Sequence, residues 1–264
     1  MLASLNTGAQ LRAAISNANP QDHSTTVDVN NVHFSWSKET SPTLTIRRFT
    51  VKQGEKLFLE GPSGCGKSTF LSLLAGINKV AAGTVSILGN QLENMNGAER
   101  DSFRADHIGL IFQMFNLLSY LSVIENVTLP CMFSKHRKKR ALENSENIKT
   151  EAMRILTRLE LSDPAIVKRP VMELSVGQQQ RVAAARALMG RPELIICDEP
   201  TSSLDQVNRE SFLKLLFEEC EKSGSSLIFA SHDTLLAPQF DRAITFDEIN
   251  VGRDTSCTTK REVQ

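Results

Sequence analysis

The fold is decided by one stretch of the chain, Gly61-Pro62-Ser63-Gly64-Cys65-Gly66-Lys67-Ser68, which matches the pattern G-x-x-x-x-G-K-[ST] at every fixed position. Glycines let a loop turn its backbone N–H groups inward, and the N-terminus of a following helix adds the positive end of its dipole, so a polyphosphate meets many donors at once. We expect Lys67 to reach the β- and γ-phosphates of a nucleotide and Ser68 to coordinate Mg²⁺. The run from Gly61 to Thr69 is therefore predicted to bind nucleotide.

A phosphate-binding loop of this type lies between a strand and a helix, and the flanking sequence predicts both. Lys56–Glu60 is a short apolar run that predicts a strand, and a helix is expected from Lys67 to Gly76. Further strands are predicted at 27–36, 84–88, 194–197 and 227–230, and further helices at 144–161 and 207–220. This alternation predicts an α/β fold with a parallel sheet and a helical insertion at 113–170.

Two carboxylates, Asp198 and Glu199, follow the predicted buried strand 194–197. In an open α/β sheet, ligands bind beyond the carboxyl ends of the strands. We expect Asp198 to hold Mg²⁺, directly or through water, and Glu199 to polarise the attacking water as a general base. The alternative is a strand that simply ends in solvated acids. The phosphate loop favours the functional interpretation, but that loop alone fits a kinase, a GTPase or a transporter ATPase.

A third motif narrows the family. The sequence Leu174-Ser175-Val176-Gly177-Gln178-Gln179-Gln180-Arg181 resembles the signature of ATP-binding-cassette ATPases and lies shortly before the Asp-Glu strand, as in that family. Gln113 resembles the family's Q-loop glutamine, Asp205 its D-loop aspartate and His232 its switch histidine. The alternatives are a surface glutamine, a helix-capping aspartate and a histidine at a strand end. The resemblance covers about residues 27 to 249.

This resemblance implies a P-loop NTPase (RecA-like) core with a mostly parallel sheet, an antiparallel β subdomain and a helical insertion, over residues 27–250. Residues 1–26 are expected to form a flexible extension and residues 251–264 a frayed tail. The resemblance also implies ATP hydrolysis with Mg²⁺, with Gln113, Glu199 and His232 as catalytic residues. Gln113 would be a metal ligand as well, beside Ser68 and Asp198.

In this family the signature segment completes the nucleotide site of a second, head-to-tail subunit. Ser175, Gly177, Gln178 and Asp205 are therefore predicted to contact ATP across a homodimer. The family usually has Gly-Gly where this chain has Val176-Gly177. Because valine does not take a positive φ comfortably, we expect this loop to be slightly altered.

Trp36 occupies the position of the aromatic residue that stacks on adenine in this family. A flat indole can stack on any base. The alternative is that Val32, Phe34 and Trp36, which alternate along the predicted strand 27–36, all face the core.

Two stretches, 108–118 and 123–130, look most like the lipoprotein-releasing and macrolide-exporter group, in which a small ATPase drives separate integral-membrane permease subunits. Cell-division-type and importer ATPases are alternatives. ATP-binding-cassette proteins that do not transport usually carry long coiled coils or two cassettes, and this sequence has neither. A nucleotide kinase or a GTPase would leave the signature, the D-loop and His232 unexplained.

Composition agrees with a role that depends on a partner. The formal net charge of zero gives no support for nucleic-acid binding, and no apolar run reaches the roughly 18–20 residues that cross a bilayer. The five scattered cysteines argue against a disulfide framework or a zinc site.

We expect a soluble chain at the cytoplasmic face of the inner membrane, attached through the permease. The basic run 135–140 is expected to be a solvated loop between helices rather than a contact with anionic headgroups.

Overall fold

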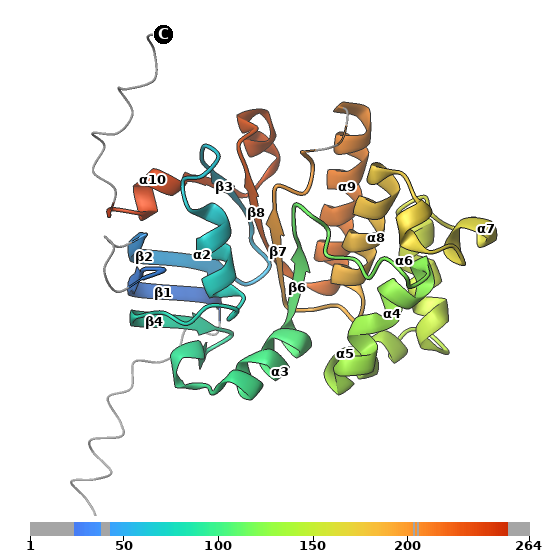
Figure 1. The fold of residues 1–264 in the computed structure, drawn as a ribbon, viewed down its shortest axis with the longest axis horizontal. Coiled ribbons are helices and arrows are strands. Elements are labelled where there is room, and N and C mark those ends of the chain that lie inside the picture. Colours follow the sequence, from blue (N-terminus) through green and yellow to red (C-terminus); the bar gives the residue numbers. More distant parts are fainter. Residues whose placement is uncertain (1–23, 38–42, 203, 205, 253–264) are drawn as a thin grey trace, which may run out of the picture.

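Two β-sheets lie side by side in the computed structural model, which describes residues 24–37, 43–202, 204 and 206–252 (Figure 1). The larger sheet is parallel and has the strand order β6 (Ile108–Ile111), β7 (Leu194–Asp198), β8 (Ser226–Ser231), β3 (Lys56–Glu60) and β9 (Arg242–Thr245). The smaller sheet is antiparallel, with the order β2 (Leu44–Lys52), β1 (Thr25–Phe34), β4 (Ala82–Ile87) and β5 (Asn90–Gln91). The predicted combination of a parallel and an antiparallel sheet is confirmed.

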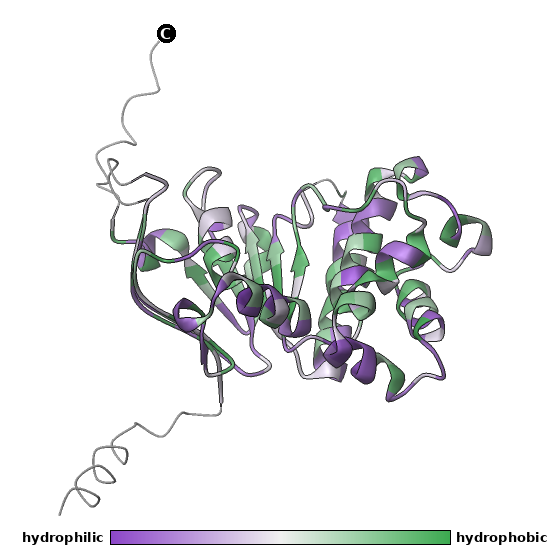
Figure 2. Ribbon diagram, turned by 60° about the horizontal axis from the view of Figure 1, so that its bottom comes forward, coloured by the Kyte–Doolittle hydropathy of each residue, from purple (hydrophilic) through white to green (hydrophobic). Residues whose placement is uncertain are grey.

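The parallel sheet is buried on both faces, because consecutive residues of its central strands face different cores. In β7, Leu194 and Ile196 belong to the core shared with the antiparallel sheet, whereas Ile195 and Cys197 belong to the core shared with the helices. A strand of this kind is apolar at every position, which is typical of parallel sheets. Figure 2 shows the result as a band of hydrophobic strands through the middle of the molecule.

Helices surround these sheets. Following the chain, they are α2 (Lys67–Leu74), α3 (Gly97–His107), α4 (Val123–Phe133), α5 (Lys135–Leu142), α6 (Ile148–Arg158), α7 (Pro164–Val167), α8 (Val176–Leu188), α9 (Gln206–Ser223) and α10 (Phe246–Ile249). Short 3-10 helices occur at Leu92–Asn94, Val171–Glu173 and Thr234–Gln239. Helix α2 packs between the two sheets, while α4 and α6 pack against α8 on the far side of the parallel sheet (Figure 1). Helices α4 to α7 all fall within the predicted insertion at 113–170.

Several predicted elements need correction. The run 135–140 is not a loop but most of α5, whose first turn is capped by the Ser134 side chain, which accepts a hydrogen bond from the backbone N–H of Arg137. The predicted helix 144–161 is shorter at both ends, and β1 ends two residues before Trp36. Most of the predicted N-terminal extension, residues 1–23, and most of the predicted tail, residues 253–264, lie outside the described residues.

Within the described ranges, no helix is both long enough and apolar enough to span a membrane.

Candidate functional site

A cavity of about 360 Å³ opens at the carboxyl ends of the parallel strands. It collects side chains from segments that are far apart in the sequence. Its lining residues are Trp36, Thr43, Ser63, Gly64, Gly66, Lys67, Ser68, Thr69, Gln113, Asp198, Glu199 and His232. Gly61, Pro62 and Cys65 complete the phosphate loop beside it. Predicted residues from the loop, from the end of β7 and from three further segments, which carry Trp36, Gln113 and His232, therefore meet in one place.

The phosphate loop joins β3 to α2, and Gly66 is the N-cap residue that directly precedes α2. Its φ of 112° lies in a region that favours glycine. A Cβ atom at Gly66 would also lie 3.1 Å from Leu44 Cδ2 and 3.3 Å from Phe246 Cε1, so the close packing beneath the loop admits no side chain there without a shift. No side chain caps the N-terminus of α2. This terminus is therefore suited to an anion from outside the chain.

Lys67 is buried at the base of the cavity. Its Nζ donates hydrogen bonds to the carbonyl oxygens of Gly61 and Pro62, the second at 3.1 Å, and lies 3.4 Å from Glu199 Oε1. The ammonium group is thus held against the loop and beside a carboxylate. This arrangement places one positive charge where a polyphosphate would be bound.

Glu199 lies between two potential partners. Its Oε1 faces Lys67, and its Oε2 is 2.8 Å from Nδ1 of His232, which follows β8. The backbone of Glu199 has a φ of +49°, a conformation that costs a residue with a side chain about 1–2 kcal/mol. It is held there in part by a hydrogen bond from the Glu199 N–H to the Ala230 carbonyl, 2.9 Å long. A strained, doubly contacted carboxylate at the end of a buried strand is consistent with a catalytic role.

Asp198 is the best candidate for a metal ligand. Burial raises its pKa, although a hydrogen bond from the Ser68 hydroxyl and the charge of Lys67 oppose this shift. In the described part of the chain, its buried Oδ1 has no hydrogen-bond partner. A carboxylate oxygen and a hydroxyl side by side, one of them unpaired, form a donor set that suits a hard divalent cation.

Gln113 is exposed in the loop that follows β6. The loop turns sharply after it, since Phe115 and Asn116 both have positive φ values, of 58° and 49°. Arg186 of α8 donates to the carbonyl oxygens of both residues, at 2.7 and 2.6 Å. Sequence reasoning missed Arg186. The available signal was a single cationic residue within the small apolar run 182–188 of α8.

Trp36 lies beyond the end of β1 and is 66% exposed, so the alternative that places it in the core is wrong. Val32 and Phe34, by contrast, are buried. The indole packs edge-on against Phe34, with ring centroids 5.1 Å apart. It lines the cavity on the side of the antiparallel sheet. Stacking on adenine stays a prediction.

The signature segment forms the N-terminus of α8. Ser175 accepts a hydrogen bond from the Gln178 N–H at 3.3 Å, and the Gln178 side chain accepts one from the Ser175 N–H at 3.0 Å. Val176 is the first residue of the helix and is not among the residues with positive φ, so its backbone is helical and does not need the positive φ that valine disfavours. Ser175, Gly177 and Gln178 are not among the described residues that line the cavity. Asp205 lies outside the described residues.

Comparison with known protein families matches residues 44–202 to the family described as ABC transporter. The chain belongs to this family. Among its relatives, the uncharacterized ABC transporter ATP-binding protein YbbA of Escherichia coli (strain K12) is 39% identical over 201 residues, which are 76% of this chain and 84% of the relative. The lipoprotein-releasing system ATP-binding protein LolD of Zymomonas mobilis is 37% identical over 198 residues, or 75% and 82% of the two chains.

Among solved structures, the dimeric post-hydrolysis state of the ATP-binding cassette MJ0796 bound to ADP and Pi superposes with a TM-score of 0.71 and 33% identity. The superposition covers 86% of this chain and 95% of that one. A second dimeric MJ0796 structure gives a TM-score of 0.70. The predicted family is confirmed, and the chain is an ATP-hydrolysing member of it.

Proposed function

We propose that this ATPase drives a separate integral-membrane permease of the lipoprotein-release or macrolide-export type. The observation that carries the proposal is the single cavity in which the phosphate loop, the carboxylate pair of β7, Gln113 and His232 meet. The transport partner is supported by family membership, and its type by LolD relatives at 36–37% identity. The permease would hold the ATPase at the cytoplasmic face of the membrane.

Nucleotide binding rests on the phosphate loop. Lys67 would pair with the β- and γ-phosphates, and the uncapped N-terminus of α2 would supply N–H donors. Trp36 would stack on the base from the rim of the cavity. Because Trp36 is the only tryptophan, its fluorescence should change when ATP is added; an unchanged spectrum would contradict stacking.

The metal would be Mg²⁺, held by Ser68, Asp198 and Gln113 together with the phosphates. The buried Oδ1 of Asp198, which has no hydrogen-bond partner among the residues that the structure describes, supports this assignment. When bound, Mg²⁺ neutralises charge on the phosphate oxygens. The protein's own part is to hold the phosphates against Lys67.

Glu199 would accept the proton of the attacking water. His232, which contacts its Oε2 at 2.8 Å, fixes the orientation of this carboxylate and lines the same cavity as Lys67. A general base positioned in this way contributes about 10²–10⁴-fold to a rate. Gln113 lies on a loop that Arg186 connects to α8 by hydrogen bonds. A contact between Gln113 and the bound nucleotide would therefore affect the position of the helical insertion.

Two subunits would be needed for a complete site. Ser175, Gly177 and Gln178 belong to a helix whose N-terminus is not part of the cavity in its own chain, so they would act on the nucleotide of a head-to-tail second copy. The dimeric MJ0796 structures support this arrangement. Asp205 is assigned to the same interface by its place in the motif.

The test is the variant Glu199→Gln, which keeps the shape of the side chain but removes the base. It should bind ATP, hydrolyse it at least about 100-fold more slowly, and elute as a dimer with Mg-ATP on size exclusion. Trapped in gently solubilised native membranes, it should co-purify with a permease. Recovery of an importer permease would overturn the proposed transport type, and a strictly monomeric variant would contradict the two-subunit site.

A further inference from the structure

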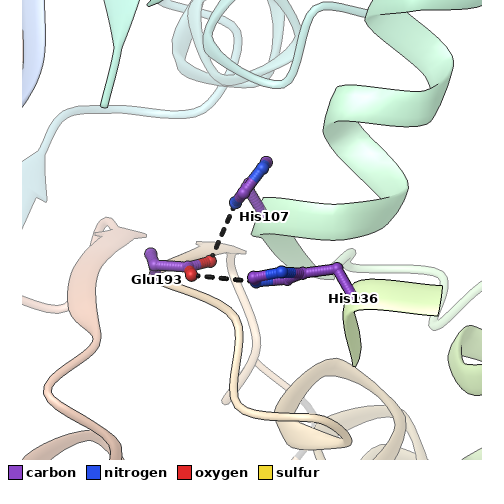
Figure 3. Close-up of side chains that lie close together, drawn as sticks. All are labelled: His107, His136 and Glu193. Carbon is purple, nitrogen blue, oxygen red and sulfur yellow. Dashed lines mark hydrogen bonds and ion pairs between the residues drawn. The ribbon is translucent and has the colours of Figure 1, made fainter. Parts of the chain in front are cut away.

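A second cluster of chemically active side chains lies at the opposite end of β7 from Asp198 and Glu199. Glu193 directly precedes this strand and accepts contacts from two histidines (Figure 3). Nδ1 of His107, the last residue of α3, is 3.1 Å from Glu193 Oε2, and Nε2 of His136, in the first turn of α5, is 3.1 Å from Oε1. The two imidazole rings are 4.9 Å apart between centroids.

We propose that His107, His136 and Glu193 form a binding site for a divalent transition-metal ion of the Zn²⁺ class. Two imidazole nitrogens and a carboxylate are ligands that such ions prefer. Among the side chains that the structure describes, these three are the one group of histidine, cysteine or acidic residues whose ligand atoms converge in this way, all within 4.8 Å of one another.

The distances suit this chemistry. Bonds of about 2.0–2.1 Å in a tetrahedral site place neighbouring ligand atoms about 3.3 Å apart. In the structure each histidine nitrogen lies 3.1 Å from a different oxygen of the Glu193 carboxylate, His107 from Oε2 and His136 from Oε1. One ligand atom from each residue lies within 4.8 Å of the other two, so rotation of these partly exposed side chains is enough to bring one carboxylate oxygen and both nitrogens to the tetrahedral spacing.

The cluster is also open to solvent. The side chains of His107, His136 and Glu193 are 26%, 37% and 27% exposed, so an ion can enter and a water molecule can complete its coordination.

Arg140 would compete with a metal ion for the carboxylate of Glu193. Its guanidinium pairs with the same carboxylate oxygen that faces His136. A bound metal ion would have to share Glu193 with this fixed positive charge. Removal of that charge should therefore strengthen metal binding, whereas it should weaken a cluster that serves only as an ion pair.

An ion bound here would join three parts of the fold. It would tie α5 of the helical insertion to α3 and to the start of β7, whose other end carries Asp198 and Glu199. It would thus restrain the insertion against the sheet without touching the nucleotide cavity. The site contains no cysteine, which is why the cysteine pattern of the sequence did not reveal it.

The test uses the full-length, nucleotide-free protein after chelator treatment, in excess Mg²⁺ so that hard-cation sites are filled. Co²⁺ is the probe, because its visible absorption reports tetrahedral nitrogen and oxygen ligation, while thiolate ligation from any cysteine would add an intense near-ultraviolet band. We expect one Co²⁺ per chain, displaced by Zn²⁺. His107→Ala and His136→Ala should each weaken binding by about 100-fold or more. The exposed His33, on β1, provides the matched control His33→Ala, which should bind as the original protein does.

Arg140→Gln separates the two interpretations without removing a ligand. Stronger Co²⁺ binding, by several-fold, supports the site. Unchanged or weaker binding in Arg140→Gln, absence of the tetrahedral spectrum in the original protein, or binding that persists in both histidine variants would each overturn it. Circular dichroism of every variant checks that the fold is intact, and the spectrum of the original protein tests the proposal whether or not a histidine variant folds.

Discussion

Two helix N-termini of this protein are predicted to meet the same phosphate group, yet they are built in opposite ways. Helix α2 follows its N-cap residue Gly66 without a side-chain cap, and next to it the buried Oδ1 of Asp198 has no hydrogen-bond partner among the described residues. Helix α8 begins with a complete capping box, in which the side chains of Ser175 and Gln178 each accept a hydrogen bond from the other's backbone N–H.

The difference shows which half of the site is ready for a ligand. The α2 end leaves donors and a carboxylate that an anion and a cation from outside can satisfy. At the N-terminus of α8, the capping box already pairs the backbone N–H groups of Ser175 and Gln178 with side chains of the same chain. This terminus can therefore remain stable on the surface of a single subunit. The Ser175 hydroxyl accepts a hydrogen bond from the Gln178 N–H, and its own O–H can still donate to a phosphate on a second copy. We therefore expect nucleotide binding to depend on the first terminus, and the second to act only in the proposed dimer.

The largest effect is expected from Lys67→Ala. This substitution removes the cation beside the α2 terminus, so ATP binding measured by calorimetry should weaken by at least about 100-fold. The exposed Lys79, shortly after α2, offers the control Lys79→Ala, which should bind ATP normally. Retained affinity in Lys67→Ala would mean that the uncapped helix terminus is sufficient by itself.

Asp198→Asn should separate function from stability. Burial raises the pKa of Asp198, so ionisation at neutral pH destabilises the folded chain, and the neutral amide should raise the free energy of unfolding by roughly 1 kcal/mol. This gain should disappear as the pH falls below about 4, where the carboxyl group is protonated in both states. ATP hydrolysis should fall by about 100-fold or more, since a charged ligand of the proposed Mg²⁺ is lost. The exposed Asp247 in α10 is the comparison, because Asp247→Asn should bring no gain in denaturant unfolding experiments.

Ser175→Ala should act on the other terminus. Loss of the cap should cost about 1 kcal/mol, and hydrolysis should fall about tenfold while ATP affinity of the monomer stays unchanged. Helix α4 has the same capping box, formed by Ser122 and Glu125, so Ser122→Ala is a matched control. It should lose similar stability but keep the hydrolysis rate. Equal loss of hydrolysis in both variants would make Ser175 a structural cap alone.

The smallest effect is expected from Val176→Gly, which restores the glycine pair usual in the family. Val176 has a helical backbone and a side chain that is 53% exposed, so glycine relieves no strain. It should lower the free energy of unfolding by about 0.5 kcal/mol, measured with a denaturant, because glycine is the poorer helix former. Hydrolysis should be nearly unchanged. A gain in stability would show that valine is strained at this helix terminus.

Strands that carry or adjoin a sequence motif were predicted more accurately than strands and helices without one. The bounds of β3 were predicted correctly, and β7 and β8 differ from their predicted ends by one residue. Strands β2, β6 and β9 and helices α3 and α4 were not predicted. Strand β9, for example, is a short edge strand of which no residue is fully buried, so its sequence carries little apolar signal.

Helix α5 shows why composition can mislead. Its run of basic residues indicates a solvated loop, but the side chain of Arg137 is buried and donates to the carbonyl oxygens of Ile108, Ala187 and Met189. Arg140 pairs with Glu193. These partners lie between 29 and 53 positions away along the chain, so no local sequence pattern predicts the contacts.

The sequence by itself determined the features that depend on a few consecutive residues: the glycine loop ahead of α2 and the carboxylates at the end of β7. Local backbone geometry and short hydrogen bonds are set by neighbours in the chain, so a motif is enough to predict them. Only the tertiary structure decided which distant groups meet. It brought Glu199 to His232, Arg186 to the loop of Gln113, and His107 and His136 to Glu193. Those contacts follow from the order of the parallel strands and the packing of helices on them, which no short stretch of sequence specifies.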